Sequence, residues 1–427
     1  MYSSTWAVRM AGLGMALLIA CAPTSRIGGP GEVGRGERGR PVRIGLLEKE
    51  STVALESSET MEVTVGPGTL HGTAFQFTSG AGEMTVSGPG GQARGQKAVC
   101  ESRSPIRVNG TGYRGRIEIA QTAEGLTVVN EVGLEDYLCG VVPREIGYLR
   151  AEESEAMKAQ AIAARTYTVA HIGRRSSRGF DLYSDTRDQV YGGVAAESEI
   201  GNRAVSETAG KVMTFQGQYI QAFFHSTCGG STVNIEDVWD SPPVPYLKRV
   251  YDADSRGFHC QESRHFRWVE VYSQRQAHEI IGANLSSVVS DAPSAIGRLR
   301  EVTVEAQSLS GRAQTTRIVS DRGTWQVSKD KIRNVLCRPI DGTPGLRSSY
   351  IRLFTDRTPE GFLRRLTVSG GGNGHGIGMC QWGAIGMARK GYTYEQIINH
   401  YYRGVQIINY QAARVASGMT DAPAGEG

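Results

Sequence analysis

The sequence lacks both a long apolar run and a marked excess of charge of either sign. Its 427 residues include 47 Lys and Arg against 43 Asp and Glu, which gives a formal net charge of +4. A dedicated nucleic-acid binder needs a strongly basic binding face, so we expect no nucleic-acid partner. Hydrophobic residues make up 39% and charged residues 21% of the chain. These fractions are typical of a folded soluble protein and exclude a protein that spans the membrane many times.

Two common ligand-binding motifs are also missing. None of the seven cysteines forms a CxxC pair, which argues against a tetra-Cys zinc site. The Gly-rich segment 370–378 does not lead into Gly-Lys-Ser/Thr, so it is not a phosphate loop.

Gly itself is abundant, with 55 residues, whereas the 15 Pro are unremarkable. The excess of Gly predicts tight turns and close backbone approaches, in a chain long enough for one large or two modest domains.

A short apolar run, Met10–Ala20, lies near the N-terminus and follows Arg9. It is roughly half as long as the ~20 apolar residues that a membrane-spanning helix needs. We therefore interpret residues 1–20 as a signal peptide. A buried N-terminal helix is the alternative.

The end of this run, Leu18-Ile-Ala-Cys21, resembles the bacterial lipobox, in which the signal is removed before the Cys and the thiol is acylated. We predict that Cys21 is lipidated and anchors the protein to a membrane of the cell envelope. Ala22 rather than Asp follows, which by resemblance favours the outer membrane, facing the periplasm, if the cell has two membranes. The Gly- and Arg-rich residues 21–40 are expected to form a flexible tether.

Six further cysteines in an exported chain suggest disulfides, and the pair we favour is Cys228 with Cys260. With His225 and His259 these residues offer an alternative, a zinc site of mixed sulfur and nitrogen ligands. The spacing matches no familiar zinc pattern, and an oxidising compartment favours a disulfide. Nucleophilic catalysis by Cys228 or Cys380 needs a thiolate that such a compartment tends to oxidise. We therefore expect neither a metal nor a cofactor.

The pattern of the chain predicts an α+β fold. β-type runs alternate with Gly-containing turns through residues 41–140. A core of mixed elements over 141–260 follows, then a β-rich accessory lobe over 261–370 and a closing core segment over 371–410. Residues 411–427 are expected to be a disordered tail. The predicted strands are 42–47, 62–65, 73–78, 117–120, 126–129, 212–215 and 219–224, and the predicted helices are 152–172, 197–209, 274–281, 379–389 and 394–402.

The first candidate for chemistry is Glu145, in the segment Val141-Val-Pro-Arg-Glu-Ile-Gly147. We expect it on a loop between the last N-terminal strand and the long helix. Apolar neighbours there would desolvate the carboxyl group and favour its neutral form, which a general acid needs near neutral pH. A solvated Glu145 paired with Arg144 is the alternative.

The remaining candidates are polar residues at the ends of predicted elements. Gln160 and Arg165 lie on the long helix, and Tyr191 follows a polar turn. His225 emerges at a strand end, and His375, Gln381 and Trp382 lie in or just after the Gly-rich segment. Each also has a plain structural interpretation, as part of a surface helix, an ordinary loop or a turn into a packed helix.

Several long segments resemble the sporulation stage II protein D and amidase-enhancer family. They include LEDYLCGVVPREI, EAMKAQAIAARTYTV, DTRDQVYGG, FFHSTCGGSTVNIEDVW and GHGIGMCQWGAIGMARKGYTYEQIINHYYRGVQI. The similarity runs from about residue 42 to residue 408, in the same order throughout. It implies a core of mixed strands and a few helices around a glycan cleft.

The resemblance also implies an activity. Sporulation-type members are lytic transglycosylases of peptidoglycan, which cut between MurNAc and GlcNAc, leave anhydro-muramyl ends and prefer peptide-denuded glycan strands. The family's catalytic Glu matches Glu145. The residues expected to bind substrate are Gln160, Arg165, Tyr191, His225, His375 and Gln381.

One carboxyl group suffices for such a reaction, because the muramyl C6 hydroxyl attacks its own C1 at high effective concentration. Hydrolytic glycosidases generally need two carboxylates. Some sporulation members bind zinc near the stretch matched by FDLYSDTRDQVY. In this chain Leu182, Arg187 and Asp188 occupy that stretch, so we do not expect it to bind zinc. The alternative function is a murein-binding enhancer of an N-acetylmuramoyl-L-alanine amidase that cuts no glycan itself.

Overall fold

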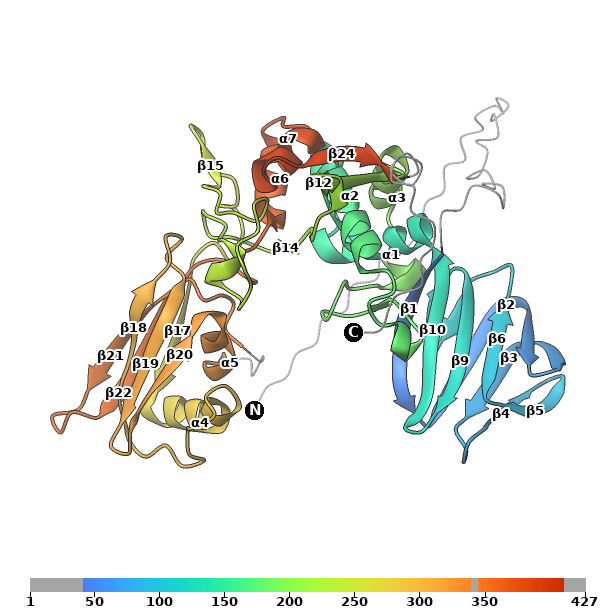
Figure 1. Ribbon diagram of the computed structural model, residues 1–427, viewed down its shortest axis with the longest axis horizontal. Coiled ribbons are helices and arrows are strands. Elements are labelled where there is room, and N and C mark those ends of the chain that lie inside the picture. Colours follow the sequence, from blue (N-terminus) through green and yellow to red (C-terminus); the bar gives the residue numbers. More distant parts are fainter. Residues whose placement is uncertain (1–40, 339–344, 411–427) are drawn as a thin grey trace, which may run out of the picture. The chain divides into compact units, whose positions relative to one another are not determined.

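The computed structural model describes residues 41–338 and 345–410 (Figure 1). The predicted signal peptide, lipidated Cys21, tether and C-terminal tail lie outside these ranges and stay predictions. Within the described ranges, no helix is both long enough and apolar enough to cross a membrane. The fold is α+β, as predicted, with helices and several separate sheets.

The N-terminal residues form a large, almost wholly antiparallel sheet, because short β-branched runs alternate with Gly-containing turns. In the long strand at Thr52–Val65, residues such as Val63 and Val65 are buried while Glu62 and Thr64 are exposed. This alternation turns one face of the sheet to a core. The strands are β1 (Pro41–Glu50), β2 (Thr52–Val65), β3 (Gly68–Thr78), β4 (Met84–Gly88), β5 (Gly91–Gly95), β6 (Lys97–Glu101), β7 (Ile106–Val108), β8 (Thr111–Tyr113), β9 (Arg116–Thr122), β10 (Gly125–Gly133) and β11 (Leu182–Tyr183).

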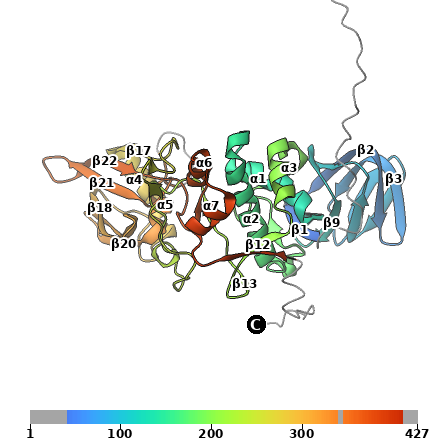
Figure 2. The same ribbon diagram turned by 90° about the horizontal axis from the view of Figure 1, so that it is seen from above.

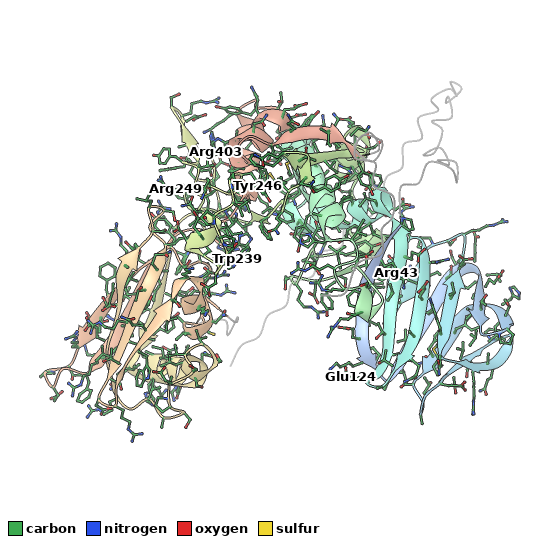
Figure 3. The ribbon with its side chains drawn as sticks, viewed as in Figure 1. Arg43, Glu124, Trp239, Tyr246, Arg249 and Arg403 are labelled. Carbon is green, nitrogen blue, oxygen red and sulfur yellow. The ribbon has the colours of Figure 1, made fainter. Side chains whose placement is uncertain are left out.

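The order of the main path is β11-β1-β10-β9-β6-β2-β3-β4-β5. Off this path, β7 pairs with β2, and β8 pairs with β7. β11 adds to β1 in parallel, which ties a segment that follows the helices back to the start of the sheet. An ion-pair network crosses β1, β9 and β10, where Arg43 donates to Glu118 at 2.7 Å and to Glu131 at 2.8 Å (Figure 3). The network holds the strands that lead directly into the first helix.

Three helices follow β10: α1 (Leu134–Ile146), α2 (Ser154–His171) and α3 (Glu199–Glu207) (Figure 2). α2 contacts both α1 and α3, and it also contacts α6 (Gln381–Arg389) and α7 (Tyr394–Tyr401) from the far end of the chain. Its six alanines allow these helices to approach closely, and nearly all of its residues from Ala156 to Val169 are buried. The alternative of a surface helix is therefore wrong for this segment.

Short strand pairs bring distant segments of the chain to α2. β12 (Lys211–Phe215) pairs with β13 (Gln218–Tyr219) and with β24 (Gln406–Asn409). β14 (Phe224–His225) runs parallel to β23 (Met379–Cys380), with His225 opposite Cys380. This two-residue pairing carries the start of α6, at Gln381, to the helical core.

A second hydrophobic core lies within residues 268–368. Two three-stranded sheets and two helices surround it, and Ser273 and Gln276 form a capping box at the start of the longer helix. The elements are β17 (Trp268–Ser273), α4 (Gln274–Asn284), β18 (Leu299–Gln307), β19 (Ala313–Ser320), β20 (Thr324–Ser328), α5 (Ile332–Val335), β21 (Ile351–Arg357) and β22 (Leu363–Gly370), preceded by the small hairpin β15 (Ala253–Asp254) and β16 (Gly257–Phe258).

Most predicted elements are confirmed. The long helix, the helices at 199–207 and 274–284 and the Thr393–Gln396 capping box of α7 lie where the sequence indicates. Two predictions are wrong. The strand expected over 219–224 is interrupted, since residues 220–223 lie in no strand. The loop expected around Glu145 is the last turn of α1.

Candidate active site

Glu145 lies in the last turn of α1, although Pro143 and Gly147 in its neighbourhood are typical of a loop. Pro143 removes only one helical hydrogen bond near the end of the helix, and its ring is buried. Gly201 makes room for that ring, because a Cβ at Gly201 would lie 2.8 Å from Pro143 Cγ. Gly147 ends the helix at a φ of 96°, where Gly is favoured. The helix therefore fixes the direction of the Glu145 side chain more firmly than a loop would.

The carboxyl group of Glu145 is partly buried, and the backbone N–H of Val190 donates to its Oε1 at 2.6 Å. Burial raises the pKa of Glu145 to about 7, and the Val190 hydrogen bond, the Gln381 amide and the nearby Arg144 only partly offset this effect. At neutral pH the group therefore exists in both forms, which suits a residue that both donates and accepts a proton.

Gln381 and Gln160 form a buried amide pair beside this carboxyl group. Gln381 is the first residue of α6, and its Nε2 lies 3.4 Å from Oε1 of Gln160 on α2. Gln160 is fully buried, yet its Nε2 has no hydrogen-bond partner among the described residues. Buried side-chain donors are nearly always paired, so an unpaired one beside a perturbed acid is a candidate to bind a ligand atom.

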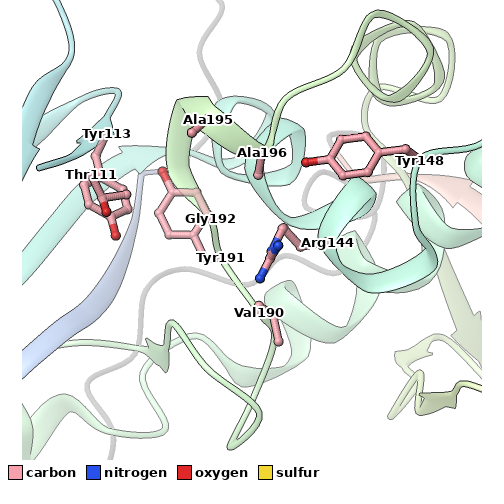
Figure 4. Close-up of a pocket in the computed structure, with 9 residues that line it drawn as sticks. All are labelled: Thr111, Tyr113, Arg144, Tyr148, Val190, Tyr191, Gly192, Ala195 and Ala196. Carbon is pink, nitrogen blue, oxygen red and sulfur yellow. The ribbon is translucent and has the colours of Figure 1, made fainter. Parts of the chain in front are cut away.

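A pocket of about 320 Å³ adjoins Glu145 through its neighbours Arg144 and Val190 (Figure 4). Arg144 is exposed, and Tyr148 is 62% exposed. An exposed aromatic ring beside a guanidinium group is a suitable surface for a sugar ring that carries a carboxylate. The pocket is lined by Thr111, Tyr113, Arg144, Tyr148, Val190, Tyr191, Gly192, Ala195 and Ala196.

Tyr191, a predicted substrate-binding residue, lines this pocket. Its hydroxyl donates to Asn130 Oδ1 at 3.0 Å, and its ring centroid lies 5.3 Å from that of Tyr113 and 4.8 Å from that of Tyr137. Gly140 leaves space for the ring, because a Cβ there would lie 2.6 Å from it. The hydroxyl is therefore already used within the protein, and only the ring borders the pocket.

Arg165 has a structural position, and its assignment as a substrate contact needs correction. The side chain is fully buried, and it donates to both carboxylate oxygens of Glu135, at 2.9 and 2.6 Å. Its remaining donors bind backbone carbonyls, including those of Lys211 at 3.2 Å and Val205 at 3.2 Å. Arg165 thereby ties α2 to α1 and to the segment after α3, with no donor left for a ligand.

His225 and His375 form a second group, with ring centroids 5.5 Å apart. His375 lies between the carbonyl of Phe224, 3.0 Å from Nε2, and the N–H of Ile377, 3.1 Å from Nδ1. Burial lowers the pKa of His375 to about 4 and that of His225 well below its usual range, so both are neutral at pH 7. No hydrogen bond among the described residues joins either histidine to Glu145. The hydrogen bonds of both histidines hold the Gly-rich segment, and the ring of His375 packs against that of Trp239, which Figure 3 labels.

The predicted disulfide pair Cys228 and Cys260 is adjacent but not bonded. The two sulfurs are 3.5 Å apart, and both residues are free cysteines. A third sulfur joins them, because the N–H of Cys228 donates to Cys380 Sγ at 3.1 Å. Three thiols therefore meet where the sequence led us to expect two.

Several residues at the acid have no distinctive signal in the sequence. The most important is the backbone N–H of Val190, and a backbone donor leaves no signal in residue types. Tyr113 and Tyr148 are also missing from the prediction. Tyr148 directly follows the motif that contains Glu145, so a search for exposed aromatic residues near the acid could have found it.

Comparisons with known proteins show the family of this chain. A family described as Stage II sporulation protein matches residues 122–215, which hold Glu145, Gln160 and Val190, and a domain of unknown function matches residues 253–378. An uncharacterized protein of Brachyspira hyodysenteriae is 31% identical over 73% of this chain and 76% of its own length. Stage II sporulation protein D of Bacillus subtilis is 30% identical over 65% of this chain and 75% of its own length. The amidase enhancer of the same organism is 29% identical over 64% of this chain and 40% of its own length.

Proposed function

Because this chain belongs to the stage II sporulation protein D family, we propose that it acts on the bacterial cell wall as a lytic transglycosylase, with Glu145 as its acid and base. The observation that carries the proposal is the environment of Glu145. Burial raises its pKa to about 7, while the backbone N–H of Val190 holds its carboxyl group in place. The proposed substrate is a peptidoglycan glycan strand, preferably one without peptides.

In the proposed reaction, protonated Glu145 gives its proton to the oxygen that joins muramyl C1 to the next sugar. The C1–O bond breaks as the C6 hydroxyl of the same muramyl residue bonds to C1. The carboxylate of Glu145 accepts the hydroxyl proton, which returns the residue to its starting form. No water is consumed, so a single carboxyl group at a pKa near neutral is sufficient.

The pocket beside the acid offers a place for the sugar. Tyr148 can stack on a sugar ring, and the exposed guanidinium of Arg144 can bind the muramyl lactyl carboxylate. Arg165 and His375 are less suited to that task, because their polar atoms already have partners within the protein.

A second candidate function is docking to murein in support of an amidase. The likeness to the protein named amidase enhancer favours it. In that case the pocket binds glycan, and Glu145 serves binding alone.

The decisive experiment compares the parent with Glu145→Gln, and uses Glu199→Gln as a matched control because Glu199 is 88% exposed. Each protein is incubated with intact murein and with amidase-treated glycan, and products are read by mass spectrometry. We expect anhydro-muramyl ends from the parent and the control, and at least about a hundredfold fewer from Glu145→Gln. Glycan binding by all three proteins without any anhydro-muramyl product would instead establish the docking function.

A further inference from the structure

Three cysteine sulfurs and one carboxylate converge in the core, away from the pocket beside Glu145. Cys228 follows β14, Cys260 follows β16, and Cys380 ends β23. One ligand atom from each cysteine and one from Asp252 all lie within 4.8 Å of one another. All four residues are buried, with exposures of 1% or less. Such a set of ligand types, from four separate segments, needs an explanation.

The distances resemble the edges of a tetrahedron around a metal ion. A tetrahedral zinc ion with Zn–S bonds of about 2.3 Å and Zn–O bonds of about 2.1 Å sets its ligand atoms roughly 3.6–3.8 Å apart. The sulfurs of Cys228 and Cys260 are 3.5 Å apart, and Cys228 Sγ lies 3.0 Å from Asp252 Oδ2. The four groups therefore need only small shifts to surround one ion.

Backbone donors point at the sulfurs. The N–H groups of Cys228 and Gly383 donate to Cys380 Sγ at 3.1 and 3.3 Å, and that of Gly230 donates to Cys228 Sγ at 3.3 Å. Donors stabilise a thiolate more than a neutral thiol, and a thiolate is the form that binds a metal. Hydrogen bonds of this kind also orient sulfur ligands from the second shell.

Asp252 is held so that one oxygen faces the sulfurs. Its Oδ1 accepts the Tyr401 hydroxyl at 2.6 Å and lies 3.4 Å from His400 Nε2, while Oδ2 faces Cys228. Gly383 keeps this space open, because a Cβ there would lie 2.6 Å from Asp252 Oδ2. A fully buried carboxylate is costly unless it is paired or coordinates a metal.

The neighbouring set of Asp252, His259 and His400 is a weaker candidate. Its ligand atoms also lie within 4.8 Å of one another. The ammonium group of Lys390, however, is 3.0 Å from His259 Nδ1 and 3.0 Å from Asp254. That positive charge opposes a cation at His259, whereas the thiol cluster has no Lys or Arg in hydrogen-bond contact with its sulfurs among the described residues.

We propose that Cys228, Cys260 and Cys380 bind one zinc ion as thiolates, with Asp252 Oδ2 as the fourth ligand. Binding releases the thiol protons to solvent, and no oxidant or reductant takes part. A disulfide accounts for two sulfurs and leaves the third unexplained, whereas a tetrahedral ion uses all three and the carboxylate. The ion has four protein ligands and no open position, so its role is structural.

The site also deepens the proposed function, on which this step rests. Cys380 directly precedes Gln381, whose amide interacts with Glu145. A metal that fixes Cys380 fixes the start of α6 and, through it, the amide beside the acid. Cys260 then links the segment after β16 to the same point. Gln381 is thereby positioned by the ion without touching it.

The test uses the full chain, purified without chelators. We expect about one zinc per chain by mass spectrometry of the metal. Cys260→Ser and Cys380→Ser should retain less than a tenth of it, while the control Cys337→Ser retains it all. Asp252→Asn should bind zinc at least about tenfold more weakly in competition with a chromogenic chelator.

A readout on the parent protein covers the case in which the variants do not fold. Cobalt added to the metal-free, reduced protein should give thiolate-to-cobalt charge-transfer absorption, which alkylation of the thiols abolishes. Absence of that absorption in folded protein would overturn the proposal, as would a Cys228–Cys260 disulfide in the purified chain. These results do not depend on glycan cleavage, so failure of the zinc site and failure of the transglycosylase are distinguishable.

Discussion

Replacement of Glu145 by Gln should stabilise the protein at high pH and leave its stability unchanged at low pH. The pKa of Glu145 is raised from 4.5 to about 7 in the folded chain, mainly by burial. An acid whose pKa is raised on folding disfavours the folded state once it ionises, and this cost is absent below its unfolded pKa. Gln has nearly the same shape and is neutral at every pH.

The magnitude follows from the shift. A difference of about 2.5 pKa units corresponds to about 3 kcal/mol, at 1.36 kcal/mol for each unit. The free energy of unfolding of Glu145→Gln should therefore match the parent near pH 4. It should exceed the parent by an amount that grows from about pH 4.5 and levels off near 3 kcal/mol above pH 7.

The assay is urea unfolding followed by circular dichroism at pH 4, 6 and 8, with Glu199→Gln as control. Glu199 is 88% exposed, so its replacement should give only a small difference. A difference for Glu145→Gln that is flat with pH, or that falls as pH rises, would refute the desolvation of Glu145. The proposed acid would then lose its main physical support.

Three further predictions concern the surroundings of the acid and the membrane. Arg165→Met should lower the free energy of unfolding by about 2–4 kcal/mol, because Glu135 and several backbone carbonyls lose their hydrogen-bond donor. The change should appear as a lower midpoint of urea unfolding. An unchanged midpoint would contradict the structural role of Arg165. Tyr148→Ala should weaken binding of denuded glycan about five- to tenfold, measured by calorimetry, with thermal stability unchanged because the ring is exposed. Cys21→Ala should release the chain from the membrane fraction if Cys21 is lipidated as we propose, and retention there would exclude the anchor.

The sequence predicts the regular elements well, because their signals are local. The Ala-rich helix, the capping box at Thr393 and the alternating N-terminal strands each depend on residues a few positions apart. Glu145 was a candidate from its local setting, as an acid among apolar residues, and the family resemblance pointed to the same residue. Its helix was missed because Gly201, which accommodates Pro143, lies far along the chain.

The positions that were predicted less well depend on distant partners. Arg165 is structural because Glu135 lies on another helix, and the two sulfurs expected as a pair are joined by Cys380 from the last part of the chain. Neither relation follows from spacing or composition. The partners of His375 are backbone groups, which no residue pattern reports.

Gln160 and Gln381, which form the amide pair, lie 221 positions apart in the sequence. This separation determines when the pair can form during synthesis of the chain. At about 5–20 residues per second, a ribosome needs roughly 10–45 s to pass from one glutamine to the other. Throughout that interval α2 exists without α6, and Glu145 lacks the amide beside it. The hydrogen bond between the two amides can therefore form only when almost the whole chain has been made, so this part of the site is completed late.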